Sequence, residues 1–194
     1  MIVQIIPHHQ KALKRQLQRQ VDAKSAHLTE AIARACGFRT HAALQADMEG
    51  ASAGLYVRFD NDAFRARLHE LTGKSAPSHL DLPELDRSAR YVKRLFENPR
   101  LEIIRMQPMS IRFRLAGIPT VVAVDLHHTG TGVFRFRRSH AIHTPTQIAP
   151  YWPGRDFDDD PAYGMNRAIT SITDNYEQAV ADGHVPNLTW LVAA

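Results

Sequence analysis

Hydrophobic residues in the first fifty positions recur with the period of a helix. Three of them are spaced every four residues: Leu13, Leu17 and Val21. This spacing places them on one side of a helix over residues 8–22. A second helix would end at Gly37, which suits a left-handed terminus, and Thr40 suits the N-cap of a third, short helix. Residues 1–50 are therefore predicted to form a three-helix module.

Further along the chain, the pattern changes to strict alternation, which is the two-residue repeat of a β-strand. Strands are predicted at 101–106, 110–116, 120–128 and 133–140. Because successive side chains of a strand point to opposite faces, one face of the sheet would be apolar. The other face would carry four arginines: Arg112, Arg114, Arg135 and Arg137.

Two hairpin loops set the expected register of this sheet. A three-residue loop in the last hairpin places Leu126 opposite Phe136, and a four-residue loop at 117–120 places Phe113 opposite Val124. Both choices keep the apolar residues together, since a shift by one residue would move every side chain to the other face. The aromatic rings then fall on the apolar face. The exposed rings typical of single-strand binders are therefore not expected beside the arginines.

Helical spacing returns on both sides of the strands. Three further helices are expected to flank the sheet, over residues 62–72, 83–97 and 161–182. Asp160 and Pro161 suit the start of the last helix, as an N-cap followed by a proline in the first turn. Residues 188–192 would add an edge strand.

The order of these elements predicts an α+β protein. Hydrophobic residues make up 44% and charged residues 23% of the chain, which is an ordinary globular balance. The small residues at 50–54 suit a joint between two parts. We therefore expect a helical module at 1–50, followed by a domain at 55–194. That domain would hold a mainly antiparallel sheet at about 101–140, flanked by helices.

Charge is distributed unevenly along the sequence, although the net charge is only +4. Residues 100–140 hold seven basic and two acidic residues, whereas residues 141–194 hold two basic and seven acidic residues. A basic sheet followed by an acidic segment suggests contact with nucleic acid or with a protein partner. The alternative is that the acidic segment folds against the sheet and neutralises it.

Cysteine content and hydropathy bear on location. Cys36 is the single cysteine, so no disulfide forms within the chain, and this fits a reducing compartment. No apolar run approaches the length that spans a bilayer. A cytoplasmic location and no membrane partner are therefore expected.

The alternating arginines are the main functional candidates. A guanidinium group presents a planar fork of donors that matches phosphate oxygens, so nucleic acid is the expected partner. The expected contacts are Arg112, Arg114, Arg135, Arg137 and Arg138, helped by Lys11, Lys14, Arg15 and Arg19. The alternative is a cross-strand salt-bridge ladder that joins Arg112, Asp125 and Arg137.

A second candidate lies in the helical module. Residues 33–44 follow the pattern Ala-x-x-x-Gly-Phe-x-Thr-His-x-x-Leu. Helix-turn-helix motifs use the same alanine-to-glycine spacing, although a purely structural helical hairpin fits it as well.

The same region carries a family resemblance. Residues 28–48 resemble a small helical module of uncharacterised proteins of bacterial mobile elements, and a related module precedes some glyoxalase-like domains. Residues 172–192 resemble the C-terminus of proteins of the same kind. The resemblance implies an accessory protein of a conjugative or integrative element and brings no known activity. The metal site of glyoxalase-like domains is not recognisable.

No catalytic motif and no cofactor are indicated, so binding without catalysis is the favoured function. One rival is a metal-assisted hydrolase or nuclease that uses His140, His143, Asp156 and Asp158. Another is a protein-interaction module, such as an inhibitor of a host defence system. The sequence does not predict the oligomeric state.

Overall fold

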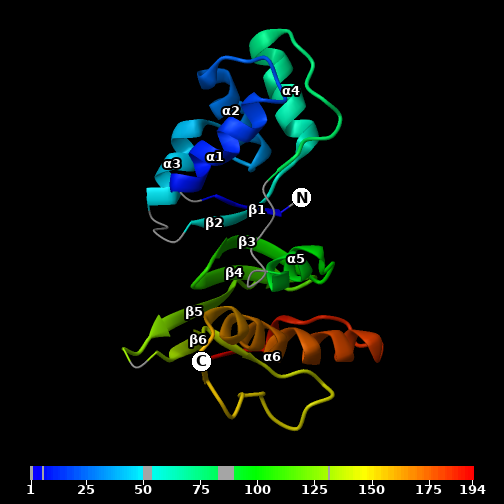
Figure 1. Cartoon of the computed structure of the whole chain (residues 1–194). Helices are drawn as coiled ribbons and strands as arrows, with labels where there is room; N and C mark the ends of the chain where they lie inside the picture. The colour runs from blue at the N-terminus through cyan, green and yellow to red at the C-terminus, as the bar shows by residue number, and fades with distance from the viewer. Residues whose placement is uncertain (1, 6, 50–53, 83–89, 131) are drawn as a thin grey trace. The chain divides into compact units, whose positions relative to one another are not determined.

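The computed structural model describes residues 2–5, 7–49, 54–82, 90–130 and 132–194 (Figure 1). The chain has an α+β fold and divides into two compact units, Met1–Arg87 and Ser88–Ala194. The division therefore lies well beyond the joint that was predicted at 50–54.

The described residues of unit 1 form four helices and a small antiparallel sheet. Its elements are β1 (Ile2–Ile5), α1 (Pro7–Gln18), α2 (Ser25–Ala35), α3 (His41–Glu49), β2 (Leu55–Arg58) and α4 (Asn61–Thr72). The three predicted helices correspond to α1, α2 and α3. Thr40 accepts a hydrogen bond from the N–H of Ala43 at the start of α3, and Gly37 has a φ of +87° after α2. Both agree with the sequence pattern.

Helix α4 explains why unit 1 extends past residue 50. Its buried side chains Phe64 and Leu68 join the same hydrophobic core as Leu17 of α1 and Leu28 of α2. The sequence pattern predicted this helix but assigned it to the domain with the sheet. Strand β1 was not predicted at all. Its partner β2 lies fifty residues away, and a four-residue apolar run carries no sign of so distant a partner.

Unit 2 contains the predicted sheet. Its elements are α5 (Arg90–Glu97), β3 (Leu101–Gln107), β4 (Ser110–Leu115), β5 (Val122–His128), β6 (Phe134–Arg138), β7 (His140–Ile142), β8 (Phe157–Asp158), α6 (Pro161–Ala181), the 3₁₀ helix η2 (Leu188–Trp190) and β9 (Leu191–Ala193). The main sheet is antiparallel with strand order β3-β4-β5-β6-β8. Strands β7 and β9 form a separate pair. Of the edge strand predicted at 188–192, only the last two residues are extended, because residues 188–190 form η2. The helix predicted at 83–97 is described only from Arg90 onward.

One of the two predicted registers is confirmed. Leu126 lies opposite Phe136, as the three-residue loop requires. Phe113, however, lies opposite Val122 rather than Val124, which is a shift of two residues. Strand β4 ends at Leu115 and β5 begins at Val122, so the turn is centred one residue earlier than predicted. An even shift leaves every side chain on its predicted face.

Helix α6 covers the apolar face of the sheet over β5 and β6 (Figure 1). Its apolar stripe is fully buried: Met165, Ala168, Ile169, Ile172, Tyr176 and Ala179. Asp160 caps the helix by accepting hydrogen bonds from the N–H groups of Ala162 and Tyr163, as predicted. The hydroxyl of Tyr176 donates to the carbonyl of Ala116, which ties the helix to the end of β4. None of the described helices is both long enough and apolar enough to cross a membrane.

Candidate nucleic-acid interface

The face of the main sheet that points away from α6 carries a row of arginines, which we call the arginine face. It consists of Arg105 in β3, Arg112 and Arg114 in β4, and Arg135 and Arg137 in β6. These positions alternate with the buried residues Ile111, Phe113 and Phe136. The four arginines predicted to share a face therefore do share it. Arg105 joins them because it lies directly opposite Arg112.

Three carboxylates partly neutralise this face. Asp125 accepts two hydrogen bonds from the guanidinium of Arg112, at 2.9 and 3.1 Å. Glu102 pairs with Arg114 at 3.0 Å, and Asp156 lies 3.6 Å from Arg135. The sequence pattern had offered Asp125 alone, because the partners Glu102 and Asp156 depend on the pairing of β3 and on the loop before β8.

The charge of Arg137 is not balanced by an ion pair within the described part of the chain. No carboxylate of the described residues lies within 4 Å of its guanidinium, although Asp125 occupies the opposite position in β5. Asp125 instead turns to Arg112, so the predicted three-residue ladder forms only in part. Among the described residues, the face presents five guanidinium groups against three carboxylates. Arg105 and Arg112 are direct cross-strand neighbours, which is an unfavourable position for two like charges.

The environment of Asp125 determines how firmly Arg112 is held. Partial burial raises the pKa of Asp125, but hydrogen bonds from Arg112 and Ser110 and the charge of Arg112 outweigh this effect. The net result is a pKa below the usual value for an aspartate. Asp125 is therefore ionised at neutral pH and orients one guanidinium of the arginine face.

Arg138, the fifth arginine predicted to contact nucleic acid, is buried and cannot do so. It follows Arg137 in β6, so its side chain points to the apolar face, and only 9% of the residue is exposed. Its guanidinium donates to the hydroxyl of Ser171 at 2.7 Å and lies 5.4 Å from the ring centre of Trp152. Burial lowers the pKa of this guanidinium. Arg138 thus joins α6 to the sheet.

The four basic residues predicted near the N-terminus belong to unit 1. Lys11, Lys14 and Arg15 lie on α1, and Arg19 lies just beyond its last residue. Lys14 is half-buried, whereas the other three are exposed. Lys11, Arg15 and Arg19 follow one another at four-residue intervals, so they form a basic stripe beside the buried leucines.

The edge strand β8 adds residues that the sequence pattern did not single out. Phe157 lies opposite Arg135 and is 37% exposed, so an aromatic ring does stand on the arginine face. The guanidinium of Arg155 lies 4.6 Å from the centre of this ring. The sequence pattern predicted no strand at this position. The alternation Arg155-Asp-Phe-Asp was the available signal, but it is too short to predict a strand.

Three of the four residues of the rival metal site, Asp156, Asp158 and His140, have other partners. Asp158 pairs with Arg167 at 2.8 Å, Asp156 pairs with Arg135, and Nδ1 of His140 lies 2.8 Å from the Ser139 hydroxyl. Within the part of the chain that the structure describes, no three His, Cys, Asp or Glu side chains converge as metal ligands. The structure therefore gives the hydrolase hypothesis based on His140 and His143 no support.

Cys36 and the segment 33–44 pack into the core of unit 1. Burial raises the pKa of the Cys36 thiol to about 12, so it stays protonated and unreactive at neutral pH. Ala33 is fully buried where α2 meets the core of unit 1, and α3 buries Leu44 and Met48. These contacts fit the structural helical hairpin.

Comparison of the chain with models of protein families, with curated proteins and with solved structures finds no match.

Proposed function

We propose that this chain is a non-enzymatic nucleic-acid-binding protein that contacts its partner through the arginine face. The observation that carries the proposal is the excess of guanidinium groups on a solvent-facing sheet surface. Arg137 supplies the clearest part of it, since it has no acidic partner among the described residues. A fixed row of planar donors suits the phosphates of a polyanion.

The ion pairs on this face do not block such binding. An exposed pair contributes only about 0–1 kcal/mol, so a phosphate competes with the carboxylate at little cost. Each guanidinium also has five N–H donors. Arg114 uses two of its nitrogens, for Glu102 and for the carbonyl of Pro119, and Arg135 makes a single contact of 3.6 Å with Asp156. Donors remain for a ligand at both positions.

The proposed biological setting is an accessory role in a bacterial mobile element. The resemblance of residues 28–48 and 172–192 supports this setting, and it names no substrate. The basic stripe on and after α1 is proposed as a second contact, through Lys11, Lys14, Arg15 and Arg19.

A binding assay with a matched control tests the proposal. Fluorescence anisotropy would measure the affinity of the full chain for labelled single-stranded DNA, single-stranded RNA and duplex DNA at low salt. Arg137→Gln is expected to weaken binding by about 3- to 10-fold, which corresponds to the loss of one charged contact of about 1 kcal/mol. Arg94→Gln, at an exposed position on α5, is the control and should bind like the wild type. Absence of binding to all three polymers, or equal losses in the two variants, would overturn the proposal.

A further inference from the structure

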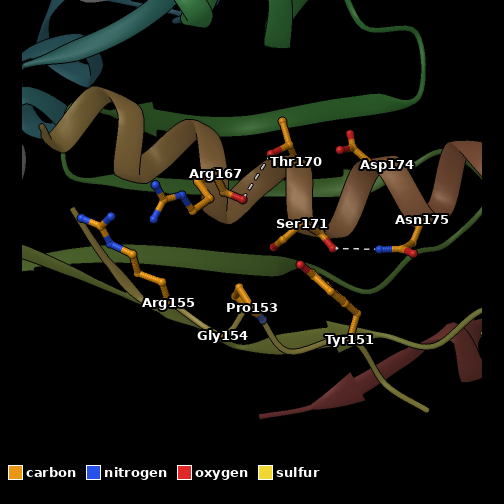
Figure 2. A pocket seen from close by; sticks show the side chains of 9 residues that line it. All are labelled: Tyr151, Pro153, Gly154, Arg155, Arg167, Thr170, Ser171, Asp174 and Asn175. Atoms are coloured by element: carbon orange, nitrogen blue, oxygen red, sulfur yellow. Dashed lines mark hydrogen bonds between the residues drawn. The ribbon is translucent and has the colours of Figure 1, made fainter.

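A groove runs between α6 and the segment before β8, and Figure 2 shows the side chains that line it. Its volume is about 360 Å³, which lies within the range of small-ligand sites. One wall comes from α6 and the other from Tyr151, Pro153, Gly154 and Arg155.

The wall on α6 is a second stripe of that helix. Its residues follow the spacing i, i+3, i+4, i+7 and i+8: Arg167, Thr170, Ser171, Asp174 and Asn175. This spacing places five polar side chains on one side of the helix. This polar stripe lies beside the apolar stripe that packs on the sheet, so α6 holds the groove in a fixed position relative to the sheet. From Arg167 to Asn175 the helix rises by about 12 Å.

One end of the groove is cationic. Arg155 and Arg167 lie together there (Figure 2). Arg167 is fixed by Asp158 at 2.8 Å and by the carbonyl of Phe157 at 3.2 Å. Arg155 donates from Nε to the same carbonyl at 3.0 Å, and no carboxylate of the described residues lies within ion-pair distance of it. Arg155 acts on Asp158 only through its charge, without a close ion pair, so its guanidinium can still bind an anion.

The opposite end offers a ring and hydrogen-bonding groups. Tyr151 is 43% exposed and lies there with Asn175 in Figure 2. Burial, and then the charge of Glu177, raises the pKa of Asp174. This carboxylate thus lacks a cationic partner strong enough to offset burial. Aspartate and asparagine side chains are suitable acceptors for the amino groups on the edge of a base, and a tyrosine ring is a suitable surface for its flat face.

Exposed aromatic rings are concentrated around this groove, and besides Tyr151 three of them lie next to an arginine. The pairs are Arg138 with Trp152, Arg155 with Phe157 and Arg167 with Tyr163. Proteins contain about one such pair per 70–80 residues, so three pairs within residues 138–167 are a local concentration. The three rings are 51%, 37% and 56% exposed. Exposed rings next to guanidinium groups are typical of surfaces that bind unpaired bases.

The groove also adjoins the arginine face. Arg155 lines the groove, while its guanidinium lies over the ring of Phe157, and Phe157 stands opposite Arg135 on the arginine face. Because β8 is the edge strand of the sheet, a chain of phosphates on the arginine face can continue around this edge into the groove.

We propose that the groove holds one nucleotide of a single-stranded nucleic acid, with its phosphate at Arg155 and Arg167 and its base against Tyr151. This inference rests on the proposed nucleic-acid function and makes it more specific. A base that stacks on a ring must be unpaired, so duplexes bind on the arginine face only, whereas single strands use both surfaces.

The test compares a single-stranded oligonucleotide with the duplex of the same sequence, using the full chain and fluorescence anisotropy. The wild type is expected to prefer the single strand by about 10-fold or more. Tyr151→Ala should weaken single-strand binding by about 5- to 20-fold and leave duplex binding unchanged. Arg155→Gln should weaken single-strand binding by a similar factor and weaken duplex binding much less. Arg137→Gln should weaken both, and Arg94→Gln neither. Circular dichroism and the melting temperature would verify that each variant is folded.

The outcomes separate the two proposals. Equal affinity for both polymers, sensitive to Arg137→Gln but not to Arg155→Gln, would overturn the groove and leave the arginine face intact. Absence of polymer binding would overturn both. Adenosine and cytidine monophosphate, added as competitors, distinguish a free nucleotide from a strand. If either one binds with Arg155-dependent affinity while no polymer binds, the single-strand assignment is wrong.

Discussion

Two consecutive arginines in β6 have opposite roles, and their positions in the strand explain the difference. Arg137 faces solvent without a carboxylate partner among the described residues, whereas Arg138 is buried against Ser171 and Trp152. The strand alternation that selected the other arginines also predicts this division, because neighbouring side chains point to opposite faces. The prediction that Arg138 contacts nucleic acid was therefore wrong, because Arg138 follows Arg137 in the strand and points to the other face.

The free energy of unfolding should distinguish these two arginines. Arg138→Ala removes a buried side chain and its hydrogen bond to Ser171, so a loss of about 2 kcal/mol is expected. Arg137→Ala removes an exposed side chain and should change stability by less than about 0.5 kcal/mol. Urea unfolding of both variants measures the difference. Similar values for the two would contradict the burial of Arg138.

A pH-dependent contribution to stability is expected from Asp125. Its pKa is lowered in the folded protein, so its ionised form stabilises the fold at pH values above the unfolded pKa of about 3.9. This contribution is lost as the pH falls through the folded pKa. Urea unfolding of wild type and Asp125→Asn between neutral and acidic pH measures it. The variant should be less stable at neutral pH, with a gap that narrows in acid; a constant gap would exclude the ion pair with Arg112 as its cause.

Among individual residues, the sequence predicted the basic members of the site better than their partners. The alternation in 110–116 and 133–140 identified four arginines on one face. Glu102 and Asp156 were not identified as partners because they come from other strands and loops. Phe157 was missed for the same reason. Contacts across strands depend on register, and the alternating pattern leaves a shift by two residues open because every side chain then keeps its face.

At the scale of elements, α6 links the two candidate surfaces. Its apolar stripe packs on the sheet, its polar stripe lines the groove, and its start is fixed by Asp160. The sequence predicted this helix and its cap correctly, because a long amphipathic period between an Asp-Pro start and a glycine end is a strong signal. The two-residue strand β8 and the strand β1 carry no such period and were missed.

Loss of the α6 cap should lower stability by a measurable amount. Asp160→Ala removes the acceptor for the N–H groups of Ala162 and Tyr163, and a loss of about 1 kcal/mol is expected. Asp159→Ala is the matched control, since it removes the same charge one residue earlier, outside the cap. Thermal or urea unfolding measures both. Equal losses would mean that charge near the helix terminus, and not the cap, stabilises α6.

At the scale of the whole molecule, the distribution of charge and the division into two units can each be compared with the sequence. The acidic segment 141–194 does not cover the arginine face with its helix, because α6 packs on the opposite side of the sheet. Its Asp156 nevertheless forms an ion pair with Arg135.

The division at Arg87 was not predictable from the small residues at 50–54, since only the packing of α4 shows which core it completes.

The salt dependence of single-strand binding reports how many phosphates the arginine face contacts. A logarithmic plot of affinity against salt between about 50 and 200 mM has a slope of about −0.7 for each phosphate contact. We expect Arg137→Gln to weaken binding and to make the slope less steep by about 0.7, and Arg94→Gln to leave both unchanged. An unchanged slope in Arg137→Gln, or affinity that does not depend on salt, would contradict a role for the arginine face in binding nucleic acid.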